Sequence, residues 1–477
     1  MKAPFSPYLA GIKPGLRALL GALQPHFEYL SLLATDSKGL AVRVSRHAKS
    51  VASSTMTTER GVVVRAAKNG LYSEYAFNRF DPEKADEKAD EILAALNAQF
   101  ALLEATGTAV YDTPLLPDEP ETLFVEKETA EMPEETDVKA LVEKMVALQE
   151  AALAKDERII ECMVNAQSTH ISKLFLTKNR DLSQSYVYSE GVIVPFATDG
   201  EKTVNGYQGV ADIRGPEIFD TLGDRLDKAV STAVELLSAG RIEPGEYDVI
   251  SSPEVSGLIA HEAFGHGVEM DMFVKDRALG KDYIGKRVGS DYVTMHEGAL
   301  CAENVASYAF DDEGTLAGDV TEIDKGILKT GVCDALSALR LGTVPTGNGK
   351  RENFEHKAYT RMTNTVFDSG ESTLDEMIAS IDYGYLLEGM ESGMEDPKHW
   401  GIQCILKLGR EIKDGKLTGK IVAPIIMTGY VPELLGSISM LSSDREVFGN
   451  GGCGKGHKEW VKVSDGGPYM KMKARLG

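Results

Sequence analysis

The sequence predicts an α+β fold, with an α/β N-terminal domain whose helices cover a sheet and a mostly β C-terminal domain that carries a histidine motif on a short helix. Near the N-terminus, short β-branched runs alternate with helical patterns. An acidic, proline-rich stretch follows at 112–135, and short β-like runs separated by glycine-rich turns dominate after residue 291. We therefore expect an N-terminal domain over 1–112, a central segment over 113–220 with linker, helix and strands, and a C-terminal domain over 221–477.

The N-terminal elements come from local patterns. The runs 39–45 and 61–65 are short, partly alternating and rich in valine, which is typical of strands. Asp81 is a candidate N-cap with Pro82 at the first helical position. The apolar residues that follow repeat every three or four positions, which predicts a helix over 81–103 with one buried face.

The central segment begins with a linker. Prolines among acidic residues predict a stiff surface excursion at 112–135. A helix is expected over 138–154, capped by Thr136 or Asp137, and strands over 171–177, 185–188 and 192–196. A third helix is expected over 222–239, ending at Gly240.

The C-terminal part starts with a turn at Pro244-Gly245 and a predicted strand at 247–251. Ser252-Pro253 is a typical cap and first turn for a short helix, which carries the central motif. Beyond residue 291 only 334–341 and 374–380 have helical patterns, so the remainder is predicted to be mostly β.

The bulk composition excludes several classes of protein. The chain has 477 residues and a formal net charge of −22, with no cluster of lysine and arginine that would attract phosphates, so we expect no direct nucleic-acid partner. No apolar run approaches the roughly 20 residues that a membrane span needs, and no export signal is evident, which predicts a cytoplasmic protein without a membrane partner. The five cysteines are an odd, scattered set that suits a reducing compartment.

The central motif is HEAFGH at 261–266. In the HExxH motif of zinc peptidases the histidines are four residues apart, about 40° around a helix, whereas a five-residue spacing places them about 140° apart. A regular helix would therefore separate His261 and His266. An i→i+5 bulge would restore a common face, and Gly265 makes such a widening inexpensive. We predict distorted helical geometry at Phe264–His266.

A catalytic zinc site needs three protein ligands and one open position. His261 and His266 supply two. Cys453, on the glycine-rich segment GNGGCG at 449–454, is the best third candidate because a thiolate there can approach an ion without obstruction. Glu262 could then take a proton from zinc-bound water. Four other residues are rival third ligands: Glu269, Asp271, His296 and Cys301.

Other catalytic motifs fit poorly. The segment 449–454 matches GxGxxG, but it follows a charged stretch and precedes no helical pattern. The run 342–350 lacks the glycine and the Ser or Thr of a P-loop, and no GxSxG nucleophile motif is present.

Four segments together resemble the TldD/PmbA family, labelled "modulator of DNA gyrase": 261–271, PTGNGKR at 345–351, RMTNT at 361–365 and CGK at 453–455. The resemblance is strong over about 221–455. It implies a zinc metallopeptidase of the cytoplasm with one Zn²⁺ per chain, whose motif maps onto His261, Glu262, His266 and Cys453. Because the histidine motif is intact, the chain looks like the catalytic TldD side.

The resemblance also implies partners. We expect an unfolded-protein or short-peptide substrate, docked as an added β-strand, and a homodimer or a heterodimer with a TldE/PmbA-like paralogue. Arg351, Arg361 and Asn364 are candidate substrate-binding residues, because these polar groups lie between apolar strand positions. His457 departs from the expected pattern and is either an extra polar group in the site or a surface side chain.

The alternative hypothesis is a non-catalytic structural or regulatory subunit of a peptidase complex, in which the metal only stabilises the fold. A structural site would be closed by a fourth protein ligand and would have no use for the carboxylate of Glu262.

Overall fold

The N-terminal half of the protein is built on one long, curved sheet. We analysed a computed structural model that describes residues 1–107, 111, 113–456 and 459–477. The sheet has the strand order β4-β3-β1-β6-β7-β5, with β2 beside β1 and with β8 and β9 beside β7. Its strands are β1 (Tyr29–Val44), β2 (Lys49–Ala52), β3 (Arg60–Lys68), β4 (Leu71–Phe77), β5 (Glu121–Glu126), β6 (Ile159–Thr177), β7 (Arg180–Thr198), β8 (Thr203–Asn205) and β9 (Gln208–Asp212).

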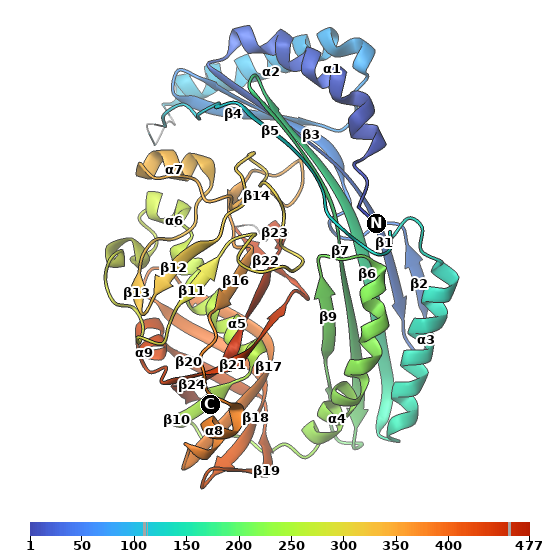
Figure 1. Cartoon of the computed structure of the whole chain (residues 1–477), viewed down its shortest axis with the longest axis vertical. Helices are drawn as coiled ribbons and strands as arrows, with labels where there is room; N and C mark the ends of the chain where they lie inside the picture. The colour runs from blue at the N-terminus through green and yellow to red at the C-terminus, as the bar shows by residue number, and fades with distance from the viewer. Residues whose placement is uncertain (108–110, 112, 457–458) are drawn as a thin grey trace.

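Two pairs of helices cover one face of this sheet (Figure 1). One end is covered by α1 (Pro7–Leu23) and α2 (Ala85–Thr106), and the other by α3 (Val138–Lys155) and α4 (Leu226–Leu236). Short 3₁₀ turns adjoin them: η1 (Gln24–His26), η2 (Pro82–Lys84) and η3 (Pro216–Arg225). Since neighbouring residues of a strand point to opposite faces, Leu32 and Val42 of β1 meet helices, whereas Leu33 packs with Phe310 of the C-terminal half.

The C-terminal half is built on an eleven-stranded sheet of order β10-β17-β18-β20-β24-β16-β11-β12-β13, with β19 beside β18 and β21 beside β24. Its strands are β10 (Gly245–Ser251), β11 (Met295–Glu297), β12 (Val320–Asp324), β13 (Ile327–Leu328), β16 (Asn364–Phe367), β17 (Tyr383–Asp396), β18 (Gly401–Lys413), β19 (Lys416–Val422), β20 (Ile425–Tyr430), β21 (Met440–Phe448) and β24 (Ser464–Leu476). Two small hairpins add β14 (Gly349–Lys350) with β15 (Tyr359–Thr360), and β22 (Gly452–Lys455) with β23 (Glu459–Lys462).

Short helices of the C-terminal half pack on this sheet. They are α5 (Pro253–Leu258), η4 (Ile259–Gly265), η5 (His266–Val268), α6 (Asp271–Val274), η6 (Leu279–Tyr283), α7 (Ala335–Leu341), α8 (Leu374–Ala379) and α9 (Val431–Gly436). The helical segment that carries the central motif lies inside the main core of this half, with Ile259, Ala263 and Phe264 fully buried. That packing holds the motif rigidly against the sheet.

The α+β prediction is confirmed, and so are the helices at 81–103, 138–154, 334–341 and 374–380, within a few residues. The helix predicted over 222–239 is 3₁₀ in its first turns and α-helical only over Leu226–Leu236. The sequence analysis did not predict α1, in which Ser6 is the N-cap and Pro7 occupies the first turn, where proline is well tolerated.

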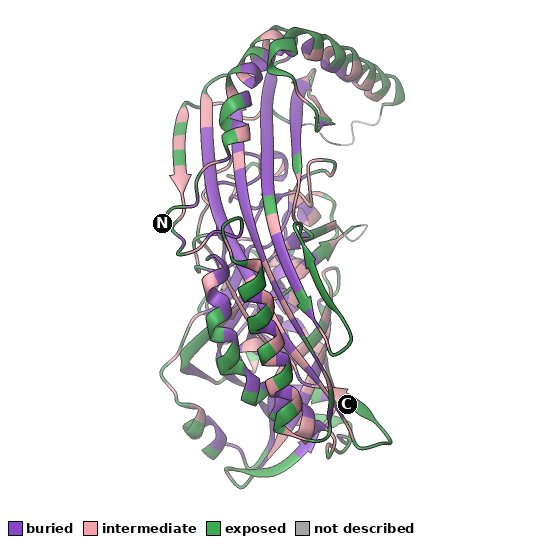
Figure 2. Ribbon diagram, turned by 90° about the vertical axis from the view of Figure 1, so that its right-hand side faces the viewer, coloured by how far each residue is buried: buried purple, intermediate pink, exposed green. Residues whose placement is uncertain are grey.

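The long strands β6 and β7 were predicted only in pieces. Their middle sections bury Ser168, Ser172, Gln184 and Ser189, which interrupts the apolar pattern that marks a strand. These polar groups find partners in the fold: Gln184 donates to the carbonyl of Phe310 at 2.8 Å, across to the C-terminal half. Figure 2 shows that these strands are buried along most of their length.

The division into three domains stays a prediction. In the structure β5 to β9, from the expected central segment, share one sheet with β1 to β4. In the described part of the chain, none of the helices has the length and apolar character to cross a membrane.

Arg65 of β3 joins the two halves. Its side chain is 6% exposed and donates to Glu74 of β4 at 2.7 Å and to Glu313 of the C-terminal half at 2.5 Å.

Arg65→Met should lower the free energy of unfolding by about 3–5 kcal/mol, because it leaves Glu313 buried without its cation. Urea denaturation measures the effect. Arg158→Met, which removes an exposed pair with Asp156, should leave the midpoint unchanged, and equal losses in the two variants would contradict the prediction.

Candidate metal centre

His261 and His266 lie on a π-helix. The α-helix α5 continues without a break into η4, which is π-helical, and then into the 3₁₀ turn η5. The N–H of His266 donates to the carbonyl of His261, an i→i+5 bond that closes one wide turn. This turn brings the two imidazoles to one face, with ring centroids 5.1 Å apart. The predicted distortion is confirmed, and the π-helix already begins at Ile259.

Gly265 is required by packing rather than by backbone freedom. Its φ of −55° and ψ of −50° are ordinary helical values that any residue adopts. A Cβ at this position would overlap the sulfur of Met362 and lie 3.1 Å from the carbonyl oxygen of Ala260. We expected Gly265 to make the widened helical turn less costly, but the structure shows that glycine is needed there because a side chain would clash.

Cys453 is presented by the hairpin β22–β23. It pairs with Val461 in the antiparallel register, is 6% exposed, and packs with Met362, Val461 and Val463. Arg361 holds the backbone of this hairpin, donating to the carbonyl of Cys453 at 2.6 Å and to that of Glu459 at 2.8 Å. The position of the sulfur is therefore fixed from both strands.

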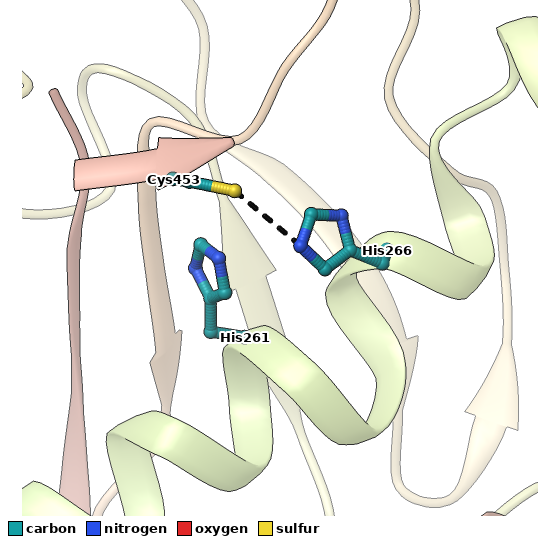
Figure 3. Close-up of side chains that lie close together, drawn as sticks. All are labelled: His261, His266 and Cys453. Carbon is teal, nitrogen blue, oxygen red and sulfur yellow. Dashed lines mark hydrogen bonds between the residues drawn. The ribbon is translucent and has the colours of Figure 1, made fainter. Parts of the chain in front are cut away.

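The three side chains converge on one point (Figure 3). The sulfur of Cys453 lies 3.3 Å from Nε2 of His266, and one ligand atom from each of His261, His266 and Cys453 lies within 4.8 Å of the others. In a tetrahedral zinc site a nitrogen and a sulfur ligand stand about 3.6 Å apart, given bond lengths near 2.1 and 2.3 Å. Two nitrogens and one sulfur at this spacing fit a zinc ion and leave a fourth position open.

Electrostatics within the cluster favour a thiolate. Burial alone would raise the pKa of the Cys453 thiol, but the adjacent His261 and His266 outweigh it and hold this pKa well below its usual range. Burial likewise would lower the pKa of each imidazole, and the Cys453 sulfur raises both instead. A metal binds the thiolate form of cysteine and the neutral form of histidine, so a cation that enters this cluster would displace the imidazole protons and find the sulfur already ionised.

Glu262 lies between the histidines and faces a cavity. Its side chain is half-buried and rests against Gly393 of strand β17. A Cβ at Gly393 would overlap Cγ of Glu262 and lie 3.0 Å from its Cδ. The absence of a side chain at position 393 therefore provides the space in which the Glu262 carboxyl group sits.

The cavity is large, about 1180 Å³, and the three clustered side chains form part of its wall. Further walls come from the glycine-rich segment 449–456 and from residues 390–395 of β17. Besides Glu262, its lining includes the carboxyl groups of Glu269, Glu391, Glu395 and Asp465. Burial raises the pKa of Asp465 to about 6 and that of Glu395 well above its usual range. The cavity can hold several residues of a peptide.

Three residues expected to bind substrate lie elsewhere. Arg361 is 1% exposed and bonded to the hairpin backbone. Arg351 pairs with Glu74 at 2.5 Å and borders a separate, small cavity. Asn364 is fully buried and donates to the carbonyls of Gly298 and Ala302. None of the three lines the large cavity, so their substrate role finds no support in their positions.

The rival third ligands have other partners. His296 contacts Asp319 at 2.8 Å, and Cys301 donates to the carbonyl of Asn364 at 3.0 Å. Asp271 accepts from Lys275 and Lys455, and Glu269 contacts Nδ1 of His266 at 3.0 Å. His457 lies outside the described residues.

Sequence reasoning overlooked several residues of the site. Gly393, Glu395 and Asp465 carry no local signal, because a glycine or an acid within a strand looks like any other before the chain folds. Lys455 was noted only as part of the CGK segment. A basic residue two positions after a candidate thiolate ligand was the one signal that could have drawn attention to it.

Comparison with known proteins identifies relatives of this chain. Residues 244–474 match the model of the PmbA/TldA metallopeptidase C-terminal domain. The chain is 27% identical over 473 residues to a metalloprotease of Synechocystis, covering 98% of each chain. It is 32% identical over 340 residues to a metalloprotease TldD homolog of Buchnera aphidicola, covering 67% of this chain and 68% of that one. A zinc metalloprotease TldD homolog of Saccharolobus solfataricus is 28% identical over 304 residues, 63% of this chain and 67% of that one.

Solved structures share the whole fold. TldE from Thermococcus kodakarensis superposes with a TM-score of 0.76 at 18% identity, covering 97% of this chain and 99% of that one. A putative modulator of a DNA gyrase from Thermotoga maritima gives 0.75 at 18% identity, covering 98% and 100%. With the matched domain and the Buchnera relative, the sequence and the fold agree: the chain belongs to the PmbA/TldD family of metallopeptidases.

Proposed function

We propose that this protein is a zinc-dependent peptidase in which His261, His266 and Cys453 hold one Zn²⁺ and Glu262 is the general base. The observation that carries the proposal is the convergence of these three ligand atoms within 4.8 Å of one another on the wall of a large cavity. Zinc, when bound, supplies Lewis-acid activation of water and of a peptide carbonyl. The zinc metalloprotease TldD homolog of Saccharolobus solfataricus supports the choice of metal.

Glu262 performs the proton transfers. Its carboxylate takes a proton as the oxygen of water adds to the carbonyl carbon of the peptide bond. When the C–N bond breaks, the same proton passes to the leaving nitrogen, so Glu262 returns to its ionised form. Its position one residue after His261, with its side chain in the cavity beside Gly393, suits this role.

The substrate is an unfolded or short peptide that adds to the edge of β17. The strand β10 pairs with β17 only over Gly384–Leu387, whereas β18 pairs with it as far as Asp396. Residues 390–395 of β17 line the cavity, and one edge of the strand there is not paired with any other strand of the described chain. A peptide bound there as a strand would be recognised mainly by its backbone, which suits cleavage with little sequence preference.

We extend the proposal to the assembly and the location of the protein. The whole-chain likeness to TldE favours a dimer, either with a second copy or with a TldE/PmbA-like paralogue. All five cysteines are free, which suits action in the reducing cytoplasm.

Glu262→Gln should abolish peptide cleavage while about one zinc per chain remains bound, because the amide cannot accept the proton and none of the ligands changes. Turnover of an unfolded protein and elemental analysis test this. Glu391→Gln, at another carboxylate of the cavity wall, is the matched control and should stay active. Full turnover by the Glu262 variant would favour the alternative of a non-catalytic subunit.

Cys453→Ser should lose zinc on dialysis, because a neutral hydroxyl is a poor substitute for a thiolate. Cys301→Ser is the control, since its sulfur bonds to a carbonyl away from the cluster. Zinc content by mass spectrometry distinguishes them. Retention of zinc by Cys453→Ser at unchanged affinity would remove the sulfur from the ligand set.

Gly393→Ala should lower kcat by about 100-fold, the scale of a general-base contribution, while zinc affinity stays as in the wild type. The new methyl group would displace the Glu262 carboxyl group without touching a ligand. Gly401→Ala on the neighbouring strand β18 meets nothing within 4 Å and should be fully active. Unchanged kcat in Gly393→Ala would contradict the assigned position of the base.

A further inference from the structure

Glu269 contacts both parts of the chain that supply the metal cluster: the histidine arm, which is the helical segment with His266, and the cysteine arm, which is the hairpin with Cys453. It follows the 3₁₀ turn η5, its side chain is 2% exposed, and its Oε2 lies 3.0 Å from Nδ1 of His266. A carboxylate at this distance requires that Nδ1 carry the proton and donate. The other nitrogen, Nε2, faces the sulfur of Cys453 at 3.3 Å and is the one that would bind a metal once its proton is released.

The same oxygen of Glu269 accepts from the hairpin that carries the sulfur. Lys455 lies two residues after Cys453 and donates to Oε2 of Glu269 at 3.0 Å. Its ammonium group also donates to Asp271 at 2.7 Å and to the carbonyl of Thr360 at 3.0 Å. One buried carboxylate thus connects the imidazole on the π-helix with the strand that presents the thiolate.

Arg361 forms a second link between Glu269 and the hairpin that carries Cys453. Its Nε is 3.9 Å from Oε1 of Glu269, and its terminal nitrogens hold the carbonyls of Cys453 and Glu459. The buried Glu269 carboxylate is thus surrounded by basic groups from both sides, namely His266, Lys455 and Arg361.

We propose that Glu269 is a positioning residue for the metal. It fixes the tautomer and orientation of His266, and it links the helical segment that carries His266 to the hairpin that carries Cys453. Nε2 of His266 and the sulfur of Cys453 are then held at a distance that suits a shared ion before the ion binds. The inference rests on the proposed zinc site. Glu269 itself is not a ligand, because its Oε2 is engaged by two donors and its carboxylate is outside the cluster of converging atoms. Carboxylates behind metal-bound histidines typically contribute 10–100-fold to metal affinity.

Glu269→Gln tests the proposal, with Asp271→Asn as its matched control. Both acids accept from Lys455, but only Glu269 contacts His266. Zinc affinity, measured by competition with a chelator on the purified full chain, should fall about 10–100-fold in Glu269→Gln and stay close to wild type in Asp271→Asn. An equal loss in the two variants would assign the effect to the charge balance of Lys455 and overturn the proposal.

Two further measurements separate positioning from ligation and from misfolding. In a His266→Ala background, Glu269→Gln should cause a smaller loss of zinc affinity than it does in the wild type, and an undiminished loss would overturn the proposal. At saturating Co²⁺ the absorption bands of Glu269→Gln should match those of the wild type, since the ligands are unchanged, and altered bands would make Glu269 a ligand instead. A wild-type chain that binds no zinc would contradict the proposed function itself, a result distinct from both of these.

Discussion

The contact between the sulfur of Cys453 and the imidazole of His266 joins parts of the chain 187 residues apart, and the architecture of the C-terminal half depends on it. Bringing a thiolate and an imidazole to 3.3 Å in a buried setting requires two rigid supports. One is the π-helix η4, packed in the main core by Ile259 and Phe264. The other is the hairpin β22–β23, which has only four residues in each strand and could not hold its shape alone.

The hairpin is held by buried basic side chains. Arg361 donates to carbonyls on both of its strands, and Lys350 donates to the carbonyl of Lys462 at 2.5 Å. Lys455, which belongs to the hairpin, donates in turn to the carboxylates of Glu269 and Asp271. Burial lowers the pKa of Lys350 to about 7, so Lys350 contributes mainly as a hydrogen-bond donor, whereas Arg361 and Lys455 supply the buried positive charge beside Cys453.

The N-terminal sheet supports the same segment directly. Glu190 of β7 accepts from Lys462 at 2.7 Å and from the backbone of Gly451 at 3.2 Å, so the long curved strand reaches the base of the hairpin. Gln184 of β7 and Arg65 of β3 bond to the segment 309–313 of the C-terminal half. Glu190, Gln184 and Arg65 therefore attach this sheet to the C-terminal half.

The sequence by itself determined the fold class, the helices with a regular apolar period, and the candidate pair His261 and His266 with Glu262 between them. It also predicted that a five-residue spacing needs a widened helix turn, because the angular geometry of a helix depends only on local spacing. The full length of β6 and β7 could not be predicted, since the partners of their buried polar side chains are set by folding: Ser172 bonds to Ser185 on the adjacent strand and Gln184 bonds to the carbonyl of Phe310 in the C-terminal half.

Only the tertiary structure decided which distant residues complete the site. Cys453 was one candidate among several, and the roles of Glu269, Gly393 and Lys455 depend on contacts between separate elements. Arg361 looked like a substrate ligand in the sequence and proved to be a support for the hairpin. A local sequence pattern records only the periodicity of one helix or strand. Distances between helices and strands depend on how the whole chain packs, so the contacts that complete the site could not be predicted from local patterns.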